Sequence, residues 1–482
     1  MKKVGKYLTI TVLLLTGLFF IGLLYLFFVP KSTLFGITFI SYNEKTLTSY
    51  YDTSQVQKVV LNSHSYDIVV ESSHSSKLYA KIENHSLGYV FTENKDLKVS
   101  ESLTNNTLKI NVVEPHGAAF KNNSLITIFL PKNQAVDLEI KNENAHVVIE
   151  DDDVMIRTLT YSAEKGNFDL RNATITEKLD LDLHKVNFDI SSKAKLNACV
   201  VDLKITTGRF DASSSTLGNI NILENERGVI LLNKCGTLFQ REKVSGGRIE
   251  ANEIGTLSFT GTDTNLYITK ITNGAIVNIT SGDIKISTLS GTSDIITENG
   301  NITIKTCSSK ITTLTKDGNI KISKAYNKTS ATTTNGDITV HFTSDAEFAT
   351  ESNKDYRHLI AKSSSGNVKA SGLNSAIIKV TNKGNINVSF ETFEANATLI
   401  SSIESNKGSI YIKTKKDSAY VLNSETKGSS RINLSQTEVY NGWTDKKITD
   451  KLINCDTLEN KTNQFTIKSS SGNILMHDDN VN

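Results

Sequence analysis

The chain has 482 residues, with 53 Lys and Arg against 51 Asp and Glu, so its formal net charge is only +2. A chain this close to neutrality has no overall basic field to draw it to nucleic acid, so we expect no nucleic-acid partner. It contains only 3 Pro, 3 Met and 1 Trp. Ser, Thr, Asn, Lys and Ile are abundant instead, a bias that favours β-structure with polar turns over helical bundles.

The N-terminal region carries the strongest local signal. Residues 7–29, YLTITVLLLTGLFFIGLLYLFFV, form 23 positions without a charged side chain, and Lys2, Lys3 and Lys6 precede them. A helix of that length spans a hydrocarbon core of about 30 Å, and the lysines favour a cytoplasmic N-terminus. The run exceeds the core of a signal peptide, about 7–15 residues, and no small-residue cleavage site precedes Pro30. We therefore predict an uncleaved single-pass anchor in the cell membrane, with the C-terminal domain extracellular.

Composition and periodicity together predict how the rest of the chain is organised. The predicted parts are a cytoplasmic tail (1–6), a transmembrane helix (7–29), a linker (30–55), an irregular β segment (56–160) and regular coils (161–482). Within the coils, the period is broken by insertions at about 341–362, 390–403 and 435–465. Such insertions leave the body of a repeat protein as loops, which often gather on a binding face.

A short motif returns at a fixed interval in the second half of the chain. TSGDIKIS, ENGNITIK, KDGNIKIS and TNGDITVH follow one another 18 residues apart. The glycine, or the residue in its place, recurs at Gly166, Val186, Gly208, Gly228, Gly247, Thr264, Gly282, Gly300, Gly318, Gly336, Gly366, Gly384, Gly408, Gly428 and Gly472. A period in this range indicates a solenoid, in which each coil buries its inner face against the next. The glycine with its preceding Asn, Asp or Lys is expected to make the corner, where a positive φ is needed.

The residues after each glycine define the strands. Positions two and four residues after the glycine are apolar in almost every repeat, as in Ile320 and Ile322, while the residue between them is polar, as in Lys321. This period of two is typical of a strand with one buried face. A second, weaker strand follows about 11–14 residues after the glycine. We therefore predict an all-β fold, a parallel β-solenoid of about 18–20 residues per coil.

The cysteines fit the same repeat. Cys235 and Cys307 occupy the position where other coils place aliphatic residues such as Leu289, so we expect them to be small buried hydrophobes. Cys199 lies in the apolar segment NACVV, and Cys455 is harder to place. Residues four coils apart cannot approach within the roughly 7 Å that a disulfide requires, and we expect four free thiols.

The irregular segment shows a resemblance to a known family. The strands YDIVVE, TLKINV and ITIFLPKNQAVDLEI precede a series of coils that match or approximate the form G-[ND]-I-x-I. This arrangement resembles the toastrack β-solenoid family of candidate adhesins in the bacterial envelope, a domain of unknown function, over about residues 56–480. The resemblance implies either surface adhesion or a role in the envelope stress response beside a membrane partner. It supplies no catalytic residues.

The sequence favours neither a metal site nor a catalytic site. The run EDDDV at residues 150–154 could offer oxygen ligands to calcium, but it lacks the spacing and glycine of a calcium loop and is better explained as an acidic turn. The nine His show no His-x-x-x-His pairing, and no Cys-x-x-Cys occurs, so we expect no metal or cofactor. A polysaccharide-active enzyme stays possible in this fold, yet the outward positions are mostly Lys, Thr and Asn rather than paired carboxylates.

The insertions contain the strongest candidates for recognition. Tyr356, Arg357 and His358 lie in the first insertion and Trp443 in the last, and such residue types are enriched at interfaces. The alternative, that they pack over the solenoid, stays open. The sequence thus predicts a membrane-anchored, non-enzymatic surface-binding or scaffold protein whose partner is a cell-wall or surface ligand or a membrane protein. The alternative function is a regulatory envelope component acting through a membrane partner.

Overall fold

The computed structural model describes residues 2–28, 32–34, 37–52, 54–91, 97–113, 117–118, 121–132, 134–196, 199–240, 244–343, 357–391, 399–434, 446–454 and 463–479. Apart from helix α1 (Lys2–Phe28), the regular elements in these ranges are β-strands, which confirms the all-β prediction. The chain divides into two compact units, Met1–Gly218 and Asn219–Asn482.

The first unit begins with α1, whose side chains are described only at residue 7 and over residues 9–22. In the described part of the chain, no helix has both the length and the apolar character needed to cross a membrane. Residues 30–55, expected to be a linker, contain strands β1 (Ser32–Leu34), β2 (Ile37–Leu47) and β3 (Tyr51–Asp52). Strands β2 and β3 pair antiparallel with β6 (Lys77–Phe91).

The rest of the first unit passes from antiparallel to parallel pairing. The antiparallel part holds β6 against β10 (Lys121–Pro131) and β9 (Gly117–Ala118), and β7 (Lys98–Thr104) against β8 (Thr107–Val113). Asn105 and Asn106 join β7 to β8 with φ values of 48° and 59°, a turn that Asn tolerates better than most residues. The parallel part contains β4 (Lys58–Asn62), β5 (Asp67–Ser73), β11 (Val136–Ile149), β12 (Met155–Leu170), β13 (Thr174–Ile190) and the start of β14 (Val200–Asn225).

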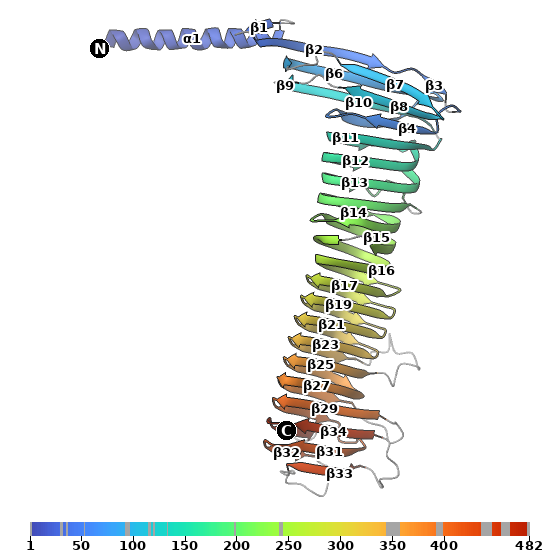
Figure 1. Cartoon of the computed structure of the whole chain (residues 1–482), viewed down its shortest axis with the longest axis vertical. Coiled ribbons are helices and arrows are strands. Elements are labelled where there is room, and N and C mark those ends of the chain that lie inside the picture. The colour runs from blue at the N-terminus through green and yellow to red at the C-terminus, as the bar shows by residue number, and fades with distance from the viewer. Residues whose placement is uncertain are drawn as a thin grey trace. The chain divides into compact units, whose positions relative to one another are not determined.

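The second unit is a parallel β-solenoid that begins with β15 (Val229–Gln240) and β16 (Val244–Ile271). One wall contains β18 (Ile284–Leu289), β20 (Ile302–Cys307), β22 (Ile320–Ala325), β24 (Ile338–Phe342), β26 (Val368–Leu373), β28 (Ile386–Phe390) and β30 (Ile410–Thr414). The facing wall contains β17 (Ala275–Ser281), β19 (Ser293–Asn299), β21 (Ile311–Asp317), β23 (Thr329–Asn335), β25 (His358–Ser365), β27 (Ser375–Lys383) and β29 (Leu399–Lys407), stacked in that order in Figure 1. Each coil therefore supplies two strands, as predicted.

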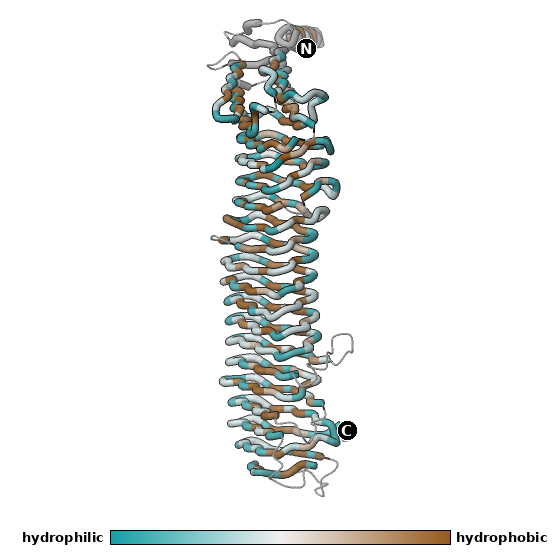
Figure 2. The backbone as a smooth tube through the Cα atoms, turned by 90° about the vertical axis from the view of Figure 1, so that its right-hand side faces the viewer, coloured by the Kyte–Doolittle hydropathy of each residue, from teal (hydrophilic) through white to brown (hydrophobic). Residues whose placement is uncertain are grey.

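The register of the coils matches the sequence period. Ile302 pairs with Ile320 and Ile320 with Ile338, so equivalent residues stack directly. Ile320 is 1% exposed, whereas Lys321 beside it is exposed. Figure 2 shows hydrophobic and hydrophilic stretches mixed along the coils. The predicted inward and outward positions are confirmed for these strands.

The described cysteines behave as predicted. Cys199, Cys235 and Cys307 are free and buried, while Cys455 lies outside the described residues. Cys307 pairs in register with Leu289, in the position of an aliphatic side chain. Burial raises the pKa of each of these three thiols to about 12, so they stay protonated and unreactive.

The glycine corner is required by close backbone approach. A Cβ on Gly336 would lie 1.9 Å from the carbonyl oxygen of Gly318, and one on Gly318 would lie 2.0 Å from that of Gly300. Positive φ is not shared by all the corners: Gly282 has φ 132°, but Gly318 and Gly336 are not among the positive-φ residues. The sequence-based expectation of positive φ therefore holds only at some corners, and the common constraint is steric.

Two polar ladders hold successive corners together. The Thr315 hydroxyl, 1% exposed, donates to the carbonyl oxygen of Gly300 at 3.0 Å, and Thr333 repeats the bond to Gly318 at 3.1 Å. On the outside, the Asn319 side-chain oxygen accepts the backbone N–H of Asp337 at 2.8 Å. Because Asn and Asp side chains both offer this acceptor, either residue serves after the glycine.

The C-terminal coils do not follow chain order. Strands β34 (Asn463–Ser469) and β35 (Ile474–Asp478) lie between the coil of β29 and β30 and the coil of β31 (Tyr420–Thr426) and β32 (Ser430–Asn433). Strand β33 (Lys447–Ile453) pairs antiparallel with β31. The corners therefore stack in the order Gly408, Gly472 and Gly428, and the chain-order series predicted from the sequence is wrong here.

Candidate functional site

The predicted recognition residues are only partly described. Tyr356 and Trp443 lie outside the described residues. His358 is the first residue of β25, and its ring nitrogen Nδ1 lies 2.6 Å from the Ser375 hydroxyl. Burial, with a smaller contribution from Lys328, lowers the pKa of His358. The backbone oxygen of Arg357 accepts the Asn374 N–H at 3.0 Å, so Arg357 and His358 sit where the chain rejoins the coil wall.

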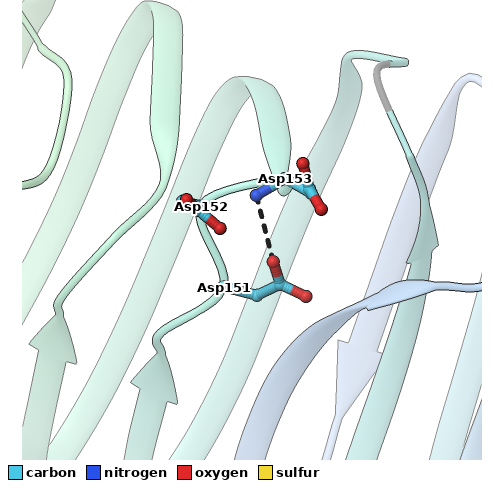
Figure 3. A group of neighbouring side chains, drawn as sticks. All are labelled: Asp151, Asp152 and Asp153. Atoms are coloured by element: carbon cyan, nitrogen blue, oxygen red, sulfur yellow. Dashed lines mark hydrogen bonds between the residues drawn. The ribbon is translucent and has the colours of Figure 1, made fainter.

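The acidic run forms a turn with local partners (Figure 3). Asp151 accepts the backbone N–H groups of Ser72 at 2.8 Å and Asp153 at 3.0 Å, and Asp153 pairs with Lys132 at 2.6 Å. Partial burial acts to raise the pKa of Asp151, but the hydrogen bonds from Ser72 and Asp153 outweigh it and lower the pKa. The carboxylates of Asp151, Asp152 and Asp153 lie within 4.8 Å of one another. Two of the three are thus occupied in holding the turn.

The sequence analysis did not identify a groove on the outer wall of the first unit, which is lined mostly by charged and hydroxyl-bearing residues. Asp169, Asp189 and Asp211 stack in register on β12, β13 and β14, on the face opposite the buried side chains of Phe168, Phe188 and Phe210. The groove has a volume of about 290 Å³ and is lined by Asp169, Leu170, Arg171, Asp189, Ile190, Ser191, Asp211, Ser213 and Ser214. We call it the Asp groove.

Basic side chains compensate each carboxylate of the Asp groove. Arg209 lies 2.6 Å from Asp189 and 3.5 Å from Asp211. Arg171 lies 3.0 Å from Asp169, and neighbouring Asp169 raises the pKa of its guanidinium. Stacking three like charges about 4.8 Å apart would be unfavourable without these partners.

Two further hydroxyl groups line the Asp groove, from Ser191, just after β13, and from Ser213 on β14. Ser213 donates both its backbone N–H, at 2.9 Å, and its hydroxyl, at 2.6 Å, to Asp211. The Ser191 hydroxyl donates to the backbone oxygen of Arg171. Hydroxyl groups therefore lie beside the carboxylates, so donors and acceptors are mixed at one surface.

This arrangement can bind polar ligands more readily than it can catalyse. Hydrolysis by two carboxylates needs one that holds a proton and one that is free to act as a base or nucleophile. Asp169, Asp189 and Asp211 each pair with a guanidinium, at 3.0, 2.6 and 3.5 Å, so none of them is an unpaired carboxylate placed to act as an acid or base. With side chains 18–38% exposed, they still offer acceptors to a ligand that brings hydroxyl or amide donors.

A signal for the Asp groove was present in the sequence. The segments NFDL, NFDI and RFDA repeat at residues 167–170, 187–190 and 209–212. The Phe of each segment identifies the inner face, and the Asp that follows must face outward. Because the pattern departs from the Lys, Thr and Asn found at this position in later coils, it marks a wall with a different surface.

The fold and the Asp groove define a repetitive β-solenoid with a recess on its outer wall that is lined by paired charges. The chain belongs to the Toastrack DUF4097 family, whose model matches residues 56–371. This confirms the resemblance found in the sequence. No protein among the curated sequences matches the chain.

Three solved structures show a weak likeness. A candidate cell adhesion protein from Clostridium sporogenes is 8% identical, with a TM-score of 0.18 over 51% of this chain and 99% of its own. Candidate adhesins from Bacteroides fragilis and Parabacteroides merdae are 11% and 13% identical, with TM-scores of 0.16 and 0.18. They cover 90% and 72% of this chain and 97% and 95% of their own. At these scores the likeness supports no conclusion about function.

Proposed function

We propose that this protein is a non-catalytic binding protein of the bacterial envelope, anchored by its N-terminal segment with the β-solenoid outside the cell. Its ligand would be a hydroxyl-rich polymer such as a cell-wall glycan, bound at the Asp groove. The observation that carries the proposal is the stack of Asp169, Asp189 and Asp211, each compensated by Arg, in a recess of about 290 Å³.

The chemistry of the Asp groove supports a hydroxylated ligand. Carboxylates accept hydrogen bonds from hydroxyl groups, and guanidinium and serine side chains donate to ring or hydroxyl oxygens. These groups repeat from coil to coil at about 4.8 Å. Such a row suits an extended polymer better than one small molecule. A strongly anionic polymer is less suited, because three carboxylates line the recess.

The placement at the membrane rests on the sequence. Residues 7–29 contain no charged side chain, and three lysines precede them. Protease added to intact cells should degrade the C-terminal domain if it lies outside. Protection until the cells are lysed would contradict the placement.

The binding proposal is tested with full-length protein in detergent and purified, insoluble cell-wall material. The variant Arg209→Gln together with Asp189→Asn removes the charge pair but keeps similar side-chain volume. We expect it to bind at least about tenfold more weakly. Lys321→Gln, on the wall of the second unit, is the matched control and should bind as the unaltered protein does.

Two results would contradict the proposal. Equal binding by the double variant and the control would remove the Asp groove as the binding surface. Absence of any glycan binding, with a membrane protein recovered instead from cells after cross-linking, would favour the regulatory alternative.

A further inference from the structure

The C-terminal coil, residues 463–478, is inserted between two coils that precede it in the chain. Strand β34 pairs in parallel with β29 on one side and β31 on the other, and β35 pairs in the same way with β30 and β32. Figure 1 shows β34 between β29 and β31. The chain must therefore leave a space one coil high when it passes from β30 to β31 and fill it afterwards.

The C-terminal coil fits this space closely. Phe465 and Ile467 are at most 1% exposed, and the Phe465 ring lies 4.9 Å from Phe390 and 5.6 Å from Tyr420. At the corner, a Cβ on Gly472 would lie 1.9 Å from the carbonyl oxygen of Gly408. The space is thus shaped and hydrogen-bonded for this coil.

Without the C-terminal coil, the space would be a strand acceptor. The chain crosses from Thr414 to Tyr420 through only five residues, 415–419, so the two flanking coils are held together by a short link. Each flanking coil would then present unpaired backbone N–H and C=O groups on two strands, together with exposed apolar side chains. Such edges pair readily with an added strand.

The C-terminal coil is also the part of the second unit best suited to leave. Among the described residues no strand follows β35, so the coil can detach without displacing another of these strands. The buried hydroxyls of Thr414, Ser424 and Ser430, in the flanking coils, have no hydrogen-bond partner among the described residues. A buried hydroxyl without a hydrogen-bond partner is destabilising, so this end should be less stable than the regular coils.

We propose that the C-terminal coil is exchanged between two copies of this chain, each filling the space of the other. The occupant is a second copy because the space is complementary to this particular coil, down to the Phe465 pocket and the Gly472 corner. The interactions made in the exchanged form are the same as in the single chain, which is why such exchange is a low-cost route to association. At low protein concentration the coil returns to its own chain, since a tethered segment has a high effective concentration.

The test uses two full-length chains of different size, co-expressed, both with Cys455→Ser. One carries Ser402→Cys and the other Thr466→Cys, because Ser402 and Thr466 are register partners on β29 and β34. A short thiol cross-linker then joins two chains only if the C-terminal coil of one occupies the space of the other. The matched control replaces Ser402→Cys by Ser330→Cys, an outward residue on β23.

We expect cross-linked dimer at least about fivefold above the control, increasing with expression level. A single chain that carries both Ser402→Cys and Thr466→Cys reports on the monomeric form and should cross-link internally. Dimer no greater than the control, with efficient internal cross-linking, would overturn the proposal. Failure of the single chain to cross-link would overturn the coil order, and the proposal with it.

Discussion

The parallel coils of the first unit and the regular coils of the second have the same kind of apolar inner face. They differ in the side chains of their outer walls. Phe188 and Ile320 are both fully or almost fully buried at equivalent positions. Outside them, Asp189 belongs to a stack of charge pairs, whereas Lys321 lies in a wall of Lys, Thr and Asn. The inner face is constrained by packing against the next coil, while the outer wall is free to change its chemistry.

The largest loss of stability is expected from a charge placed on the inner face of the regular coils. Ile320→Asp places a carboxylate without a partner in the core and should reduce the free energy of unfolding by about 3–5 kcal/mol. Lys321→Asp, one residue away and exposed, should change it by less than about 0.5 kcal/mol. Chemical denaturation measures both, and equal losses would show that the inward and outward positions are not distinct.

The next effect concerns the corner. Gly336→Ala forces a Cβ to within 1.9 Å of the Gly318 carbonyl oxygen, so the backbone must shift, at a cost of about 2–4 kcal/mol. The exposed corner residue Asn335 serves as the control, and Asn335→Ala should cost less than about 1 kcal/mol. Similar melting temperatures for the two variants would contradict the steric explanation of the glycine.

A smaller loss is expected from the inner hydroxyl ladder. Thr315→Val keeps the shape of the side chain but removes the donor to the Gly300 carbonyl oxygen, which should cost about 1–2 kcal/mol. Thr312→Val, facing outward on the same strand, should be close to neutral. The difference in unfolding midpoint between these variants measures the ladder, and no difference would remove it as a source of stability.

The outer wall of the first unit should tolerate change. Arg209→Ala removes the partner of Asp189 and Asp211, but these groups are partly exposed, so the loss should be about 0.5–1 kcal/mol. The loss should shrink in 1 M salt, where exposed charges are screened. A loss as large as that of Ile320→Asp would mean that this wall is structural rather than free for binding.

The side chain of His358 is half-buried, and replacing it should have the smallest effect on stability. Burial, followed by the charge of Lys328, lowers its pKa in the folded protein, so folding favours the neutral ring. The stability that the neutral ring contributes is fully present above the ordinary His pKa of about 6.5. It is lost as the pH falls through the lower pKa that His358 has in the folded protein. His358→Gln should therefore weaken the fall in stability between about pH 7 and 5, whereas the exposed control His74→Gln should not.

The predicted role of the first insertion, before β25, in recognition stays a prediction. Residues 344–356, with Tyr356, lie outside the described residues, as does Trp443. Since His358 is tied to Ser375, trimming should end at residue 356 rather than include His358. Circular dichroism and melting should then change little while binding weakens. Unfolding of the trimmed protein would instead indicate a structural cover.

The sequence could predict the coil because its signals are local and repeated. Ile320, Lys321 and Ile322 show their period of two within a single strand, and the 18-residue spacing fixes which residues stack. The Asp groove was less accessible, because NFDL, NFDI and RFDA occur only three times and their charge pairing depends on Arg171 and Arg209 reaching across coils.

The sequence by itself determined the all-β solenoid, its register, its family and the buried character of the cysteines at Cys235 and Cys307. Each of these follows from side-chain alternation and spacing, because each coil packs in register against an equivalent coil. Only the tertiary structure decided that the C-terminal coil lies between two earlier ones. Coils with the same period are interchangeable in register, so spacing alone cannot say which stacks on which. That order depends on how Phe465 and Gly472 fit their neighbours and on a link of five residues that holds the space open.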